Sequence, residues 1–314
     1  MKLSVAIITY NHERFIAQAI ESVLAQKVNF SYEIVIGDDC STDGTRAVIV
    51  DLQKRYPERV VAVMREQNIG AMRNFAKTIG ACKGQYLAFL EGDDYWLSAD
   101  KLQRQVDFLD SHPDRALCCH RVKTLNETGS AEFEIFPPRS AGPYTIEDLL
   151  KGNFMMTCST VLRRELIDPI PGWFFKMKLG DWPLFAMVAR HGTIELMDEV
   201  MAAYRVHPGS TWSVLPSLTR LHEGARMLRA LDEQLGFQYT NTIRQTITRS
   251  YLDLAIAARS NGKRTETAKH LASYIRSGGL RFPANRRLLA GLAAYTLIGS
   301  GYKIFSRAKT ANER

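Results

Sequence analysis

Acidic side chains occur as adjacent pairs at two places in the first part of the chain, Asp38-Asp39 and Asp93-Asp94. Each pair follows a short apolar run, and Thr9-Tyr10 follows a third such run. Carboxylate oxygens suit Mg²⁺ and Mn²⁺, which commonly share their coordination sphere with substrate phosphates. An isolated Asp-Asp pair is more often a solvated turn or a helix cap. The preceding apolar run and the second acidic pair instead favour a divalent-cation site at Asp93-Asp94.

The elements that must position these residues alternate between strand and helix. Apolar runs predict strands, and helical spacing of apolar residues predicts helices between them; the strands are expected at 3–9, 32–37, 60–64, 85–90 and 116–122. Such alternation is typical of a mainly parallel sheet with helices on both faces. Ligands bind at the carboxyl ends of the strands in these sheets. We therefore expect all three polar groups to converge at one edge.

Glycine-rich phosphate loops are absent from the sequence. No G-x-G-x-x-G follows the first strand, and no G-x-x-x-x-G-K-[ST] occurs. If the ligand carries a diphosphate, the mode of binding that remains is through a metal ion held by carboxylates. Asp39 is placed to accept hydrogen bonds from a base or ribose, as acidic residues do in nucleotide-binding folds. The alternative is a turn in which Asp39 and Ser41 only cap the next helix.

Three segments together resemble the family 2 glycosyltransferases, which have the GT-A nucleotide-diphospho-sugar transferase fold. They are VAIITYN, IGDDCSTDGT and NIGAMRNFAKTIGACKGQYLAFLEGDDYW, and the resemblance is close over 3–110 and looser to about 213. It implies a nucleoside-diphosphate-sugar donor, Mg²⁺ or Mn²⁺, and inversion at the anomeric carbon. We expect a uridine-linked donor and a hydroxyl acceptor on a glycan or lipid-linked molecule, in cell-surface polysaccharide or lipopolysaccharide synthesis.

The resemblance also assigns nucleotide-binding roles to individual residues. Thr9, Tyr10 and Asp39 match the base- and ribose-binding positions of the family. Arg73 matches a basic residue near the nucleotide. The sequence departs from the family pattern at Cys40, which occupies a position after the aspartate pair where glycine is common.

The metal-binding role falls on the D-x-D-type element of the family. Asp93 and Asp94 match it, with Asp94 expected as the more direct metal ligand and Asp93 nearer the sugar or ribose. Glu91 replaces a frequent aspartate. His207 lies in a segment that resembles the one closing over the diphosphate, so we expect it to contact phosphate or ligate the metal. A lone histidine beside Pro-Gly is otherwise more often a turn residue.

The candidate catalytic base is Asp181. Gly180-Asp181-Trp182 resembles a later acidic element of the family, often Glu-Asp, of which one carboxylate remains here. Inverting transfer needs a base that removes the proton of the attacking hydroxyl. The alternative is that Asp181 only caps a helix over 183–190.

Positive charge is concentrated in the last hundred residues. Residues 215–314 hold 17 Lys/Arg and 6 Asp/Glu, a balance of +11, within a chain whose net charge is +8. We expect a GT-A domain over 1–215, followed by a basic helical extension over 216–314. Within the domain, 1–110 is the expected nucleotide-sugar-binding half and 111–215 the acceptor-binding half.

The location of the protein is expected to be cytoplasmic. The five cysteines have no C-x-x-C spacing, and the N-terminal apolar run is too short for a signal peptide. The apolar stretch 288–305 has basic flanks, which favour peripheral contact with the anionic cytoplasmic face of the inner membrane. An ordinary buried helix is the alternative reading of that stretch.

Three rival functions fit the sequence less well. A sugar-nucleotidyltransferase would show a glycine-rich basic loop where Tyr10-Asn11-His12-Glu13 stands. A nucleic-acid-binding protein using the basic tail would need aromatic residues interleaved with Lys and Arg, and the tail has few, so no nucleic acid is expected as a partner. An inactive scaffold would have no use for the intact aspartates.

Overall fold

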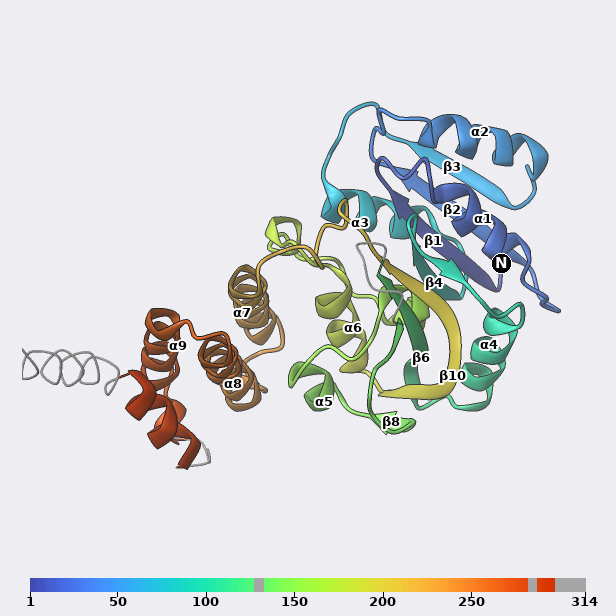
Figure 1. Ribbon diagram of the computed structural model, residues 1–314. Helices are drawn as coiled ribbons and strands as arrows, with labels where there is room; N and C mark the ends of the chain where they lie inside the picture. Colours follow the sequence, from blue (N-terminus) through green and yellow to red (C-terminus); the bar gives the residue numbers. More distant parts are fainter. Residues whose placement is uncertain (127–132, 282–286, 297–314) are drawn as a thin grey trace, which may run out of the picture. The chain divides into compact units, whose positions relative to one another are not determined.

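The computed structural model describes residues 1–126, 133–281 and 287–296. The chain divides into two compact units, Met1–Leu215 and Pro216–Arg314 (Figure 1).

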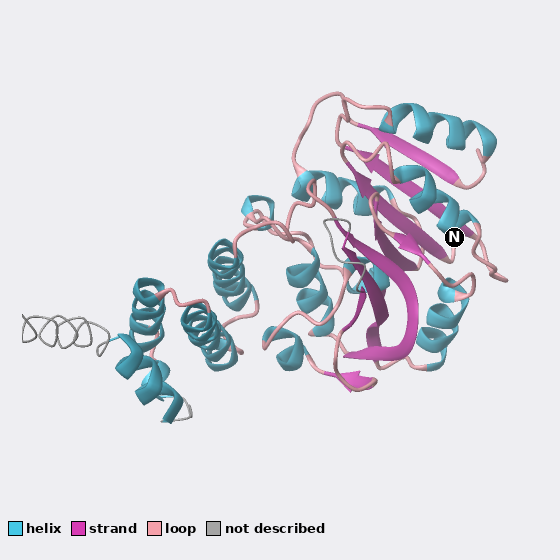
Figure 2. Cartoon of the chain, viewed as in Figure 1, coloured by secondary structure: helices cyan, strands magenta, loops and turns pink. Residues whose placement is uncertain are grey.

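A ten-stranded sheet forms the centre of the first unit within the described residues (Figures 1 and 2). Its strands are β1 (Leu3–Thr9), β2 (Tyr32–Asp38), β3 (Val60–Met64), β4 (Tyr86–Glu91), β5 (Tyr95–Trp96), β6 (Arg115–Asn126), β7 (Phe133–Phe136), β8 (Gly142–Tyr144), β9 (Val161–Arg163) and β10 (Thr193–Val206). The main order is β3-β2-β1-β4-β9-β6-β10-β5. Pairing is parallel along β3-β2-β1-β4 and between β6 and β10, and antiparallel elsewhere.

Helices cover both faces of this sheet (Figure 2). They are α1 (Ile16–Leu24), α2 (Thr45–Arg55), α3 (Ala71–Ala81), α4 (Lys101–Ser111), α5 (Ile146–Leu150) and α6 (Asp181–Ala189). Apolar residues of α1, α2 and α4 form one core cluster with alternate residues of the strands. On the other face, the ring of Phe89 lies 5.6 Å from Phe75 of α3 and 5.9 Å from Phe185 of α6. Burial on both faces explains why the strands read as continuous apolar runs, and the expected α/β architecture is confirmed.

The carboxyl ends of β2, β1 and β4 meet at one edge of the sheet. Thr9 pairs in register with Asp38, and Ile8 pairs with Glu91. The loop after β2 turns through Cys40, whose φ of 64° lies in the left-handed region that favours glycine. A glycine, which the family resemblance led us to expect at this position, would adopt this conformation without strain.

The second unit is helical in its described part, with α7 (Ser217–Gln234), α8 (Thr240–Ser260) and α9 (Arg264–Arg276). Of the apolar stretch predicted over 288–305, residues 297–305 lie outside the described residues. In the described part of the stretch, Leu292 is fully buried against Leu252, Ala255, Leu271 and Tyr274. Among the helices that the structure describes, none is both long enough and apolar enough to cross a membrane.

Candidate active site

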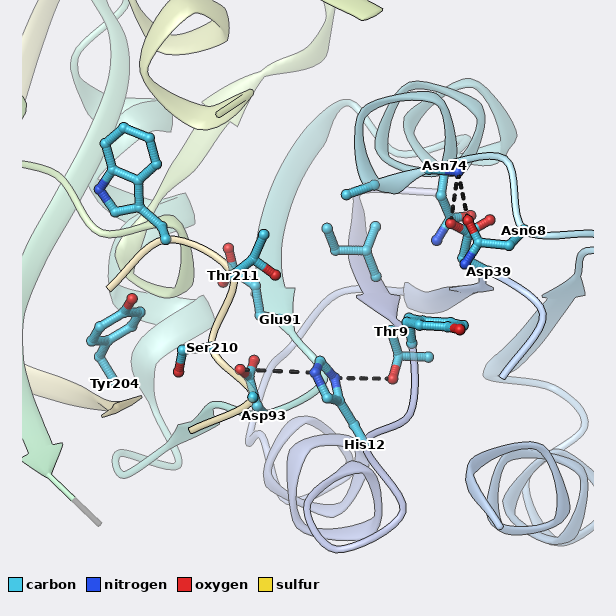
Figure 3. Close-up of a pocket in the computed structure, with 16 residues that line it drawn as sticks. Thr9, His12, Asp39, Asn68, Asn74, Glu91, Asp93, Tyr204, Ser210 and Thr211 are labelled. Carbon is cyan, nitrogen blue, oxygen red and sulfur yellow. Dashed lines mark hydrogen bonds and ion pairs between the residues drawn. The ribbon is translucent and has the colours of Figure 1, made fainter. Parts of the chain in front are cut away.

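A cavity of about 290 Å³ opens where the strand ends meet (Figure 3). Its walls come from the ends of β1, β2 and β4, the start of α3, and the segment after β10. We call it the first cavity. Thr9, Tyr10, Asp39 and Asp93, which the sequence assigned to nucleotide-sugar binding, all line it.

Asp93 lies close to two histidines: His12, which also lines this cavity, and His207, which is buried and is not among the lining residues. Oδ2 of Asp93 lies 3.1 Å from Nε2 of His207 and 3.9 Å from Nε2 of His12. Nδ1 of His12 lies 3.2 Å from Oγ1 of Thr9, so His12 stands between Thr9 and Asp93 (Figure 3). Burial alone would raise the pKa of Asp93, but the hydrogen bond with His207 and the nearby His12 lower it overall. Asp93 is therefore an anionic group at the cavity wall.

Asp94 does not face the first cavity, in contrast to its predicted role as the more direct metal ligand. Its side chain is fully buried, and its Oδ1 accepts a hydrogen bond from the backbone N–H of Arg205 at 2.8 Å. Burial and the neighbouring Asp93 raise the pKa of Asp94 well above its ordinary value. Arg205 also donates from Nη1 to the carbonyl oxygen of Asp93 at 2.6 Å. Asp94 thus anchors the turn to β10 and leaves Asp93 at the surface of the cavity.

Asp93 and His207 have the spacing of two ligands of Mg²⁺ or Mn²⁺. Among the described residues, no three His, Cys, Asp or Glu side chains gather closely enough to hold a metal ion by themselves. Two ligands at right angles in an octahedral sphere, each about 2.1 Å from the ion, lie about 3.0 Å apart. The 3.1 Å between Asp93 Oδ2 and His207 Nε2 is close to that separation. In this structure the same two atoms form a hydrogen bond, which an ion bound by both side chains would replace, with phosphate and water as its other ligands.

Asp39 and two asparagines form another part of the first cavity. Oδ1 and Oδ2 of Asp39 accept hydrogen bonds from the backbone N–H groups of Ile69 at 2.8 Å and Gly70 at 2.9 Å. Asn68 and Asn74 lie next to Asp39 (Figure 3). These bonds fasten the loop before α3 to the end of β2.

Arg73 is the predicted nucleotide contact that the structure does not bring to the first cavity. It is exposed on α3, with its guanidinium 5.9 Å from the ring centre of Phe175. Asn74 lines the cavity instead, because successive helical residues point about 100° apart. The adjacent position on α3 therefore supplies an amide at the site rather than a positive charge.

A second cavity, of about 510 Å³, adjoins the first and shares Glu91, Tyr204 and Trp212 with it. Asp181, the first residue of α6, lines this second cavity. Nδ2 of Asn153 donates to Oδ2 of Asp181 at 3.3 Å. Burial raises the pKa of Asp181, and hydrogen bonds, chiefly from the Trp182 backbone, only partly offset this effect. A carboxylate with a raised pKa is a better proton acceptor near neutral pH.

Glu91 lies at the junction of the two cavities, although the sequence marks it only as a departure from the family pattern. Its buried Oε2 has no hydrogen-bond partner among the described residues. Burial, followed by the charge of Asp93, raises the pKa of Glu91 to about 8. The Thr157 side chain lowers the pKa of both Glu91 and Asp181 and partly offsets the effect of burial. The position of Glu91 at the end of β4 is the signal that could have identified it, whereas His12 lies in the loop between β1 and α1 and has no such signal.

Comparisons with known proteins show which family this chain resembles. Residues 4–170 match the family described as Glycosyl transferase family 2. An uncharacterized protein of Mycobacterium tuberculosis is 39% identical over 212 residues, which are 67% of this chain and 60% of that protein. The putative teichuronic acid biosynthesis glycosyltransferase TuaG of Bacillus subtilis is 30% identical over 234 residues, which are 70% of this chain and 89% of TuaG. The chain spans about 60% of the length of the mycobacterial relatives it matches.

A solved structure shows the same fold. The 1–349 fragment of TarS from Staphylococcus aureus, in complex with UDP-GlcNAc, aligns with a TM-score of 0.62 at 18% identity. The alignment covers 94% of this chain and 88% of that fragment. The expected GT-A fold with C-terminal helices is thus confirmed, and the chain belongs to the family 2 glycosyltransferases.

Proposed function

We propose that the protein transfers a sugar, with inversion, from a nucleoside-diphosphate donor to a hydroxyl of a glycan or lipid-linked acceptor. A uridine-linked donor is favoured, and the proposed setting is cell-surface polysaccharide or lipopolysaccharide synthesis. The observation that carries the proposal is the pair of adjoining cavities. Asp93, in contact with the buried His207, lines the first cavity, Asp181 lines the second, and Glu91 lines both.

The first cavity is the proposed donor site. Thr9, Tyr10 and Asp39 are the proposed contacts of the base and ribose, close to the strand ends that form the wall. Asp93 and His207 would hold Mg²⁺ or Mn²⁺, because their facing atoms have the separation of neighbouring ligands. The ion would neutralise charge on the departing diphosphate.

The second cavity is the proposed acceptor site, with Asp181 as the base. Asp181 removes the proton of the acceptor hydroxyl while the oxygen attacks the anomeric carbon on the side opposite the diphosphate. The new glycosidic bond forms as the bond from the anomeric carbon to the diphosphate oxygen breaks. Asn153 holds the carboxylate of Asp181 in place through its amide.

Different parts of the chain have different proposed roles. Residues 1–110 supply the donor half and 111–215 the acceptor half of the catalytic unit. The basic second unit contacts anionic lipid at the cytoplasmic face of the inner membrane, which its excess of Lys and Arg supports.

A panel of nucleotide sugars tests the proposal through release of nucleoside diphosphate with Mg²⁺, Mn²⁺ or EDTA. We expect metal-dependent release from at least one donor. Asp93→Asn should raise the metal concentration for half-maximal rate at least about tenfold, because a neutral amide is a weaker ligand. Asp51→Asn, at an exposed position on α2, is the matched control and should behave as wild type.

A second variant separates donor binding from transfer. Asp181→Asn should keep thermal stabilisation by the donor and lose transfer by roughly 10²- to 10⁴-fold, the usual contribution of a general base. The proposal fails if no donor in the panel binds or is cleaved. Normal turnover by both the Asp93 and Asp181 variants would overturn the site assignment.

A further inference from the structure

Among the described residues, His12 is the only histidine that lines the first cavity. It lies in the loop between β1 and α1, and its Nε2 is turned toward Oδ2 of Asp93 at 3.9 Å (Figure 3). This distance is too long for a hydrogen bond. The imidazole nitrogen therefore faces the carboxylate without bonding to it.

Contacts on the other side of the ring hold His12 in this orientation. Its Nδ1 lies 3.2 Å from Oγ1 of Thr9, and its backbone N–H donates to Oγ1 of Thr45 at 2.8 Å. A Cβ built on Gly92 would lie 2.9 Å from Nδ1, so the turn after β4 packs against the ring. The hydroxyl of Thr9 can accept a hydrogen bond from Nδ1–H, and in that tautomer the lone pair of Nε2 faces Asp93. A ring N–H that donates to a fixed oxygen is the contact that orients metal-bound histidines.

The spacing of His12 and Asp93 fits a cation that lies between them. Two ligands that are each about 2.1 Å from an octahedral ion lie about 3.0 Å apart when they are neighbours and about 4.2 Å apart when they are opposite. The 3.9 Å between His12 and Asp93 is close to the second value, whereas the 3.1 Å between His207 and Asp93 is close to the first. The three side chains are not a ready-made site. The ion therefore needs phosphate oxygens of the donor to complete its sphere.

We propose that His12 is a further protein ligand of the divalent ion, through Nε2. The inference rests on the proposed function, which places the ion at Asp93. His12 lines the first cavity and His207 does not, so His12 is the imidazole within reach of an ion that enters with the diphosphate.

Pulsed EPR on bound Mn²⁺ tests this role directly, because it detects a ligating nitrogen without any turnover. The sample is the full chain with saturating Mn²⁺ and UDP, with GDP in a parallel series. His12→Gln carries an amide to the position of Nε2, and its oxygen can keep the ion bound. We expect the nitrogen coupling of the wild type to decrease by one nitrogen in His12→Gln.

A second substitution separates ligation from the contact with Thr9. His12→Asn places an amide nitrogen where Nδ1 lies and keeps that contact, but it has no atom at the position of Nε2. The affinity for Mn²⁺ in the presence of UDP, measured from the EPR signal of the free ion, should decrease at least about tenfold, since even groups that only orient a ligand contribute that much. The decrease should be smaller in His12→Gln. His222→Asn, at an exposed position on α7, is the control and should match the wild type.

The outcomes distinguish this inference from the proposed function. Unchanged Mn²⁺ affinity in His12→Asn, or unchanged nitrogen coupling in His12→Gln, would overturn the role of His12 and leave the transferase proposal intact. Wild-type protein that binds no Mn²⁺ with either nucleotide would overturn it as well. Absence of donor cleavage across the nucleotide-sugar panel would instead count against the proposed function itself.

Discussion

Three acidic residues, Glu91 at the end of β4 and Asp93 and Asp94 in the turn after it, have different environments and therefore different pKa values. Asp93 has a lowered pKa and faces the first cavity, so it is the charged member of the group. Asp94 is buried under the backbone N–H of Arg205, and its pKa is raised. Glu91 lies at the junction of the cavities with a pKa of about 8. A cation is attracted to the group that is already ionised, which favours Asp93 as the proposed metal ligand.

Lys101 is a second residue whose environment is unusual. It is fully buried, its Nζ lies 4.0 Å from the ring centre of Trp96, and no hydrogen bond to Nζ is found among the described residues. Burial lowers the pKa of Lys101 from 10.5 to about 7. Between these two pH values the unfolded chain binds more protons at Lys101 than the native chain does. The free energy of unfolding should therefore rise with pH across that window and decrease as pH falls back through it.

The variant Lys101→Met should remove this pH dependence. The difference in unfolding free energy between wild type and variant should change by at most about 1.4 kcal/mol per pH unit between pH 7 and 10.5. Urea unfolding in EDTA at several pH values measures this difference in unfolding free energy. Lys54→Met, at an exposed position, is the control variant. If the unfolding free energies of wild type and Lys101→Met changed with pH in parallel, the lowered pKa of Lys101 would be contradicted.

At the scale of elements, glycines at the two ends of β4 allow close contact with β1. A Cβ on Gly84, before β4, would lie 2.3 Å from the backbone nitrogen of Ser4. A Cβ on Gly92, after β4, would lie 2.6 Å from Oγ1 of Thr9 and 2.9 Å from Nδ1 of His12. The first contact involves backbone, which cannot move aside, whereas the second involves side chains of the site.

Substituting alanine at each glycine should therefore have different effects. Gly92→Ala displaces Thr9 and His12, so we expect at least about a tenfold higher metal requirement with a stability loss of about 1–3 kcal/mol. Gly84→Ala should destabilise the fold more, while the folded fraction keeps its metal requirement. Thermal unfolding measures the loss of stability, and titration of donor cleavage with metal measures the metal requirement. An unchanged metal requirement in Gly92→Ala would show that the contact does not position the site.

At the scale of the whole molecule, the two units carry opposite net charge. Residues 216–314 hold a balance of +11 within a chain of net charge +8, which leaves residues 1–215 at −3. Positively charged side chains on a protein surface attract anionic lipid over roughly one Debye length, which is about 10 Å at 0.1 M salt. The second unit is therefore the expected contact of the chain with a membrane.

Vesicle co-sedimentation of the full chain tests this contact. We expect binding to vesicles containing anionic lipid at low salt and weaker binding as salt increases, because screening shortens the range of attraction. Vesicles of neutral lipid are the control. Protein that remains in the supernatant with anionic vesicles at low salt would exclude the contact.

The sequence by itself determined the strands β1, β2, β3, β4 and β6 and the residues at their ends, whereas β5, β7, β8, β9 and β10 were not predicted. Their apolar periodicity is local, and burial of both sheet faces requires it wherever such a sheet forms. The pattern of residues alone is therefore enough to place Thr9, Asp39 and Asp93 at one edge of the sheet.

Only the tertiary structure decided which residues at that edge face the cavities. His207 is 114 residues from Asp93, and their contact depends on how the end of β10 packs beside the turn after β4. The same packing buries Asp94 under Arg205 and leaves Asp93 exposed to the cavity. The rotation of α3 likewise turns Asn74 inward and Arg73 outward. Side-chain direction at these positions is set by long-range contacts, which no local pattern of residues encodes.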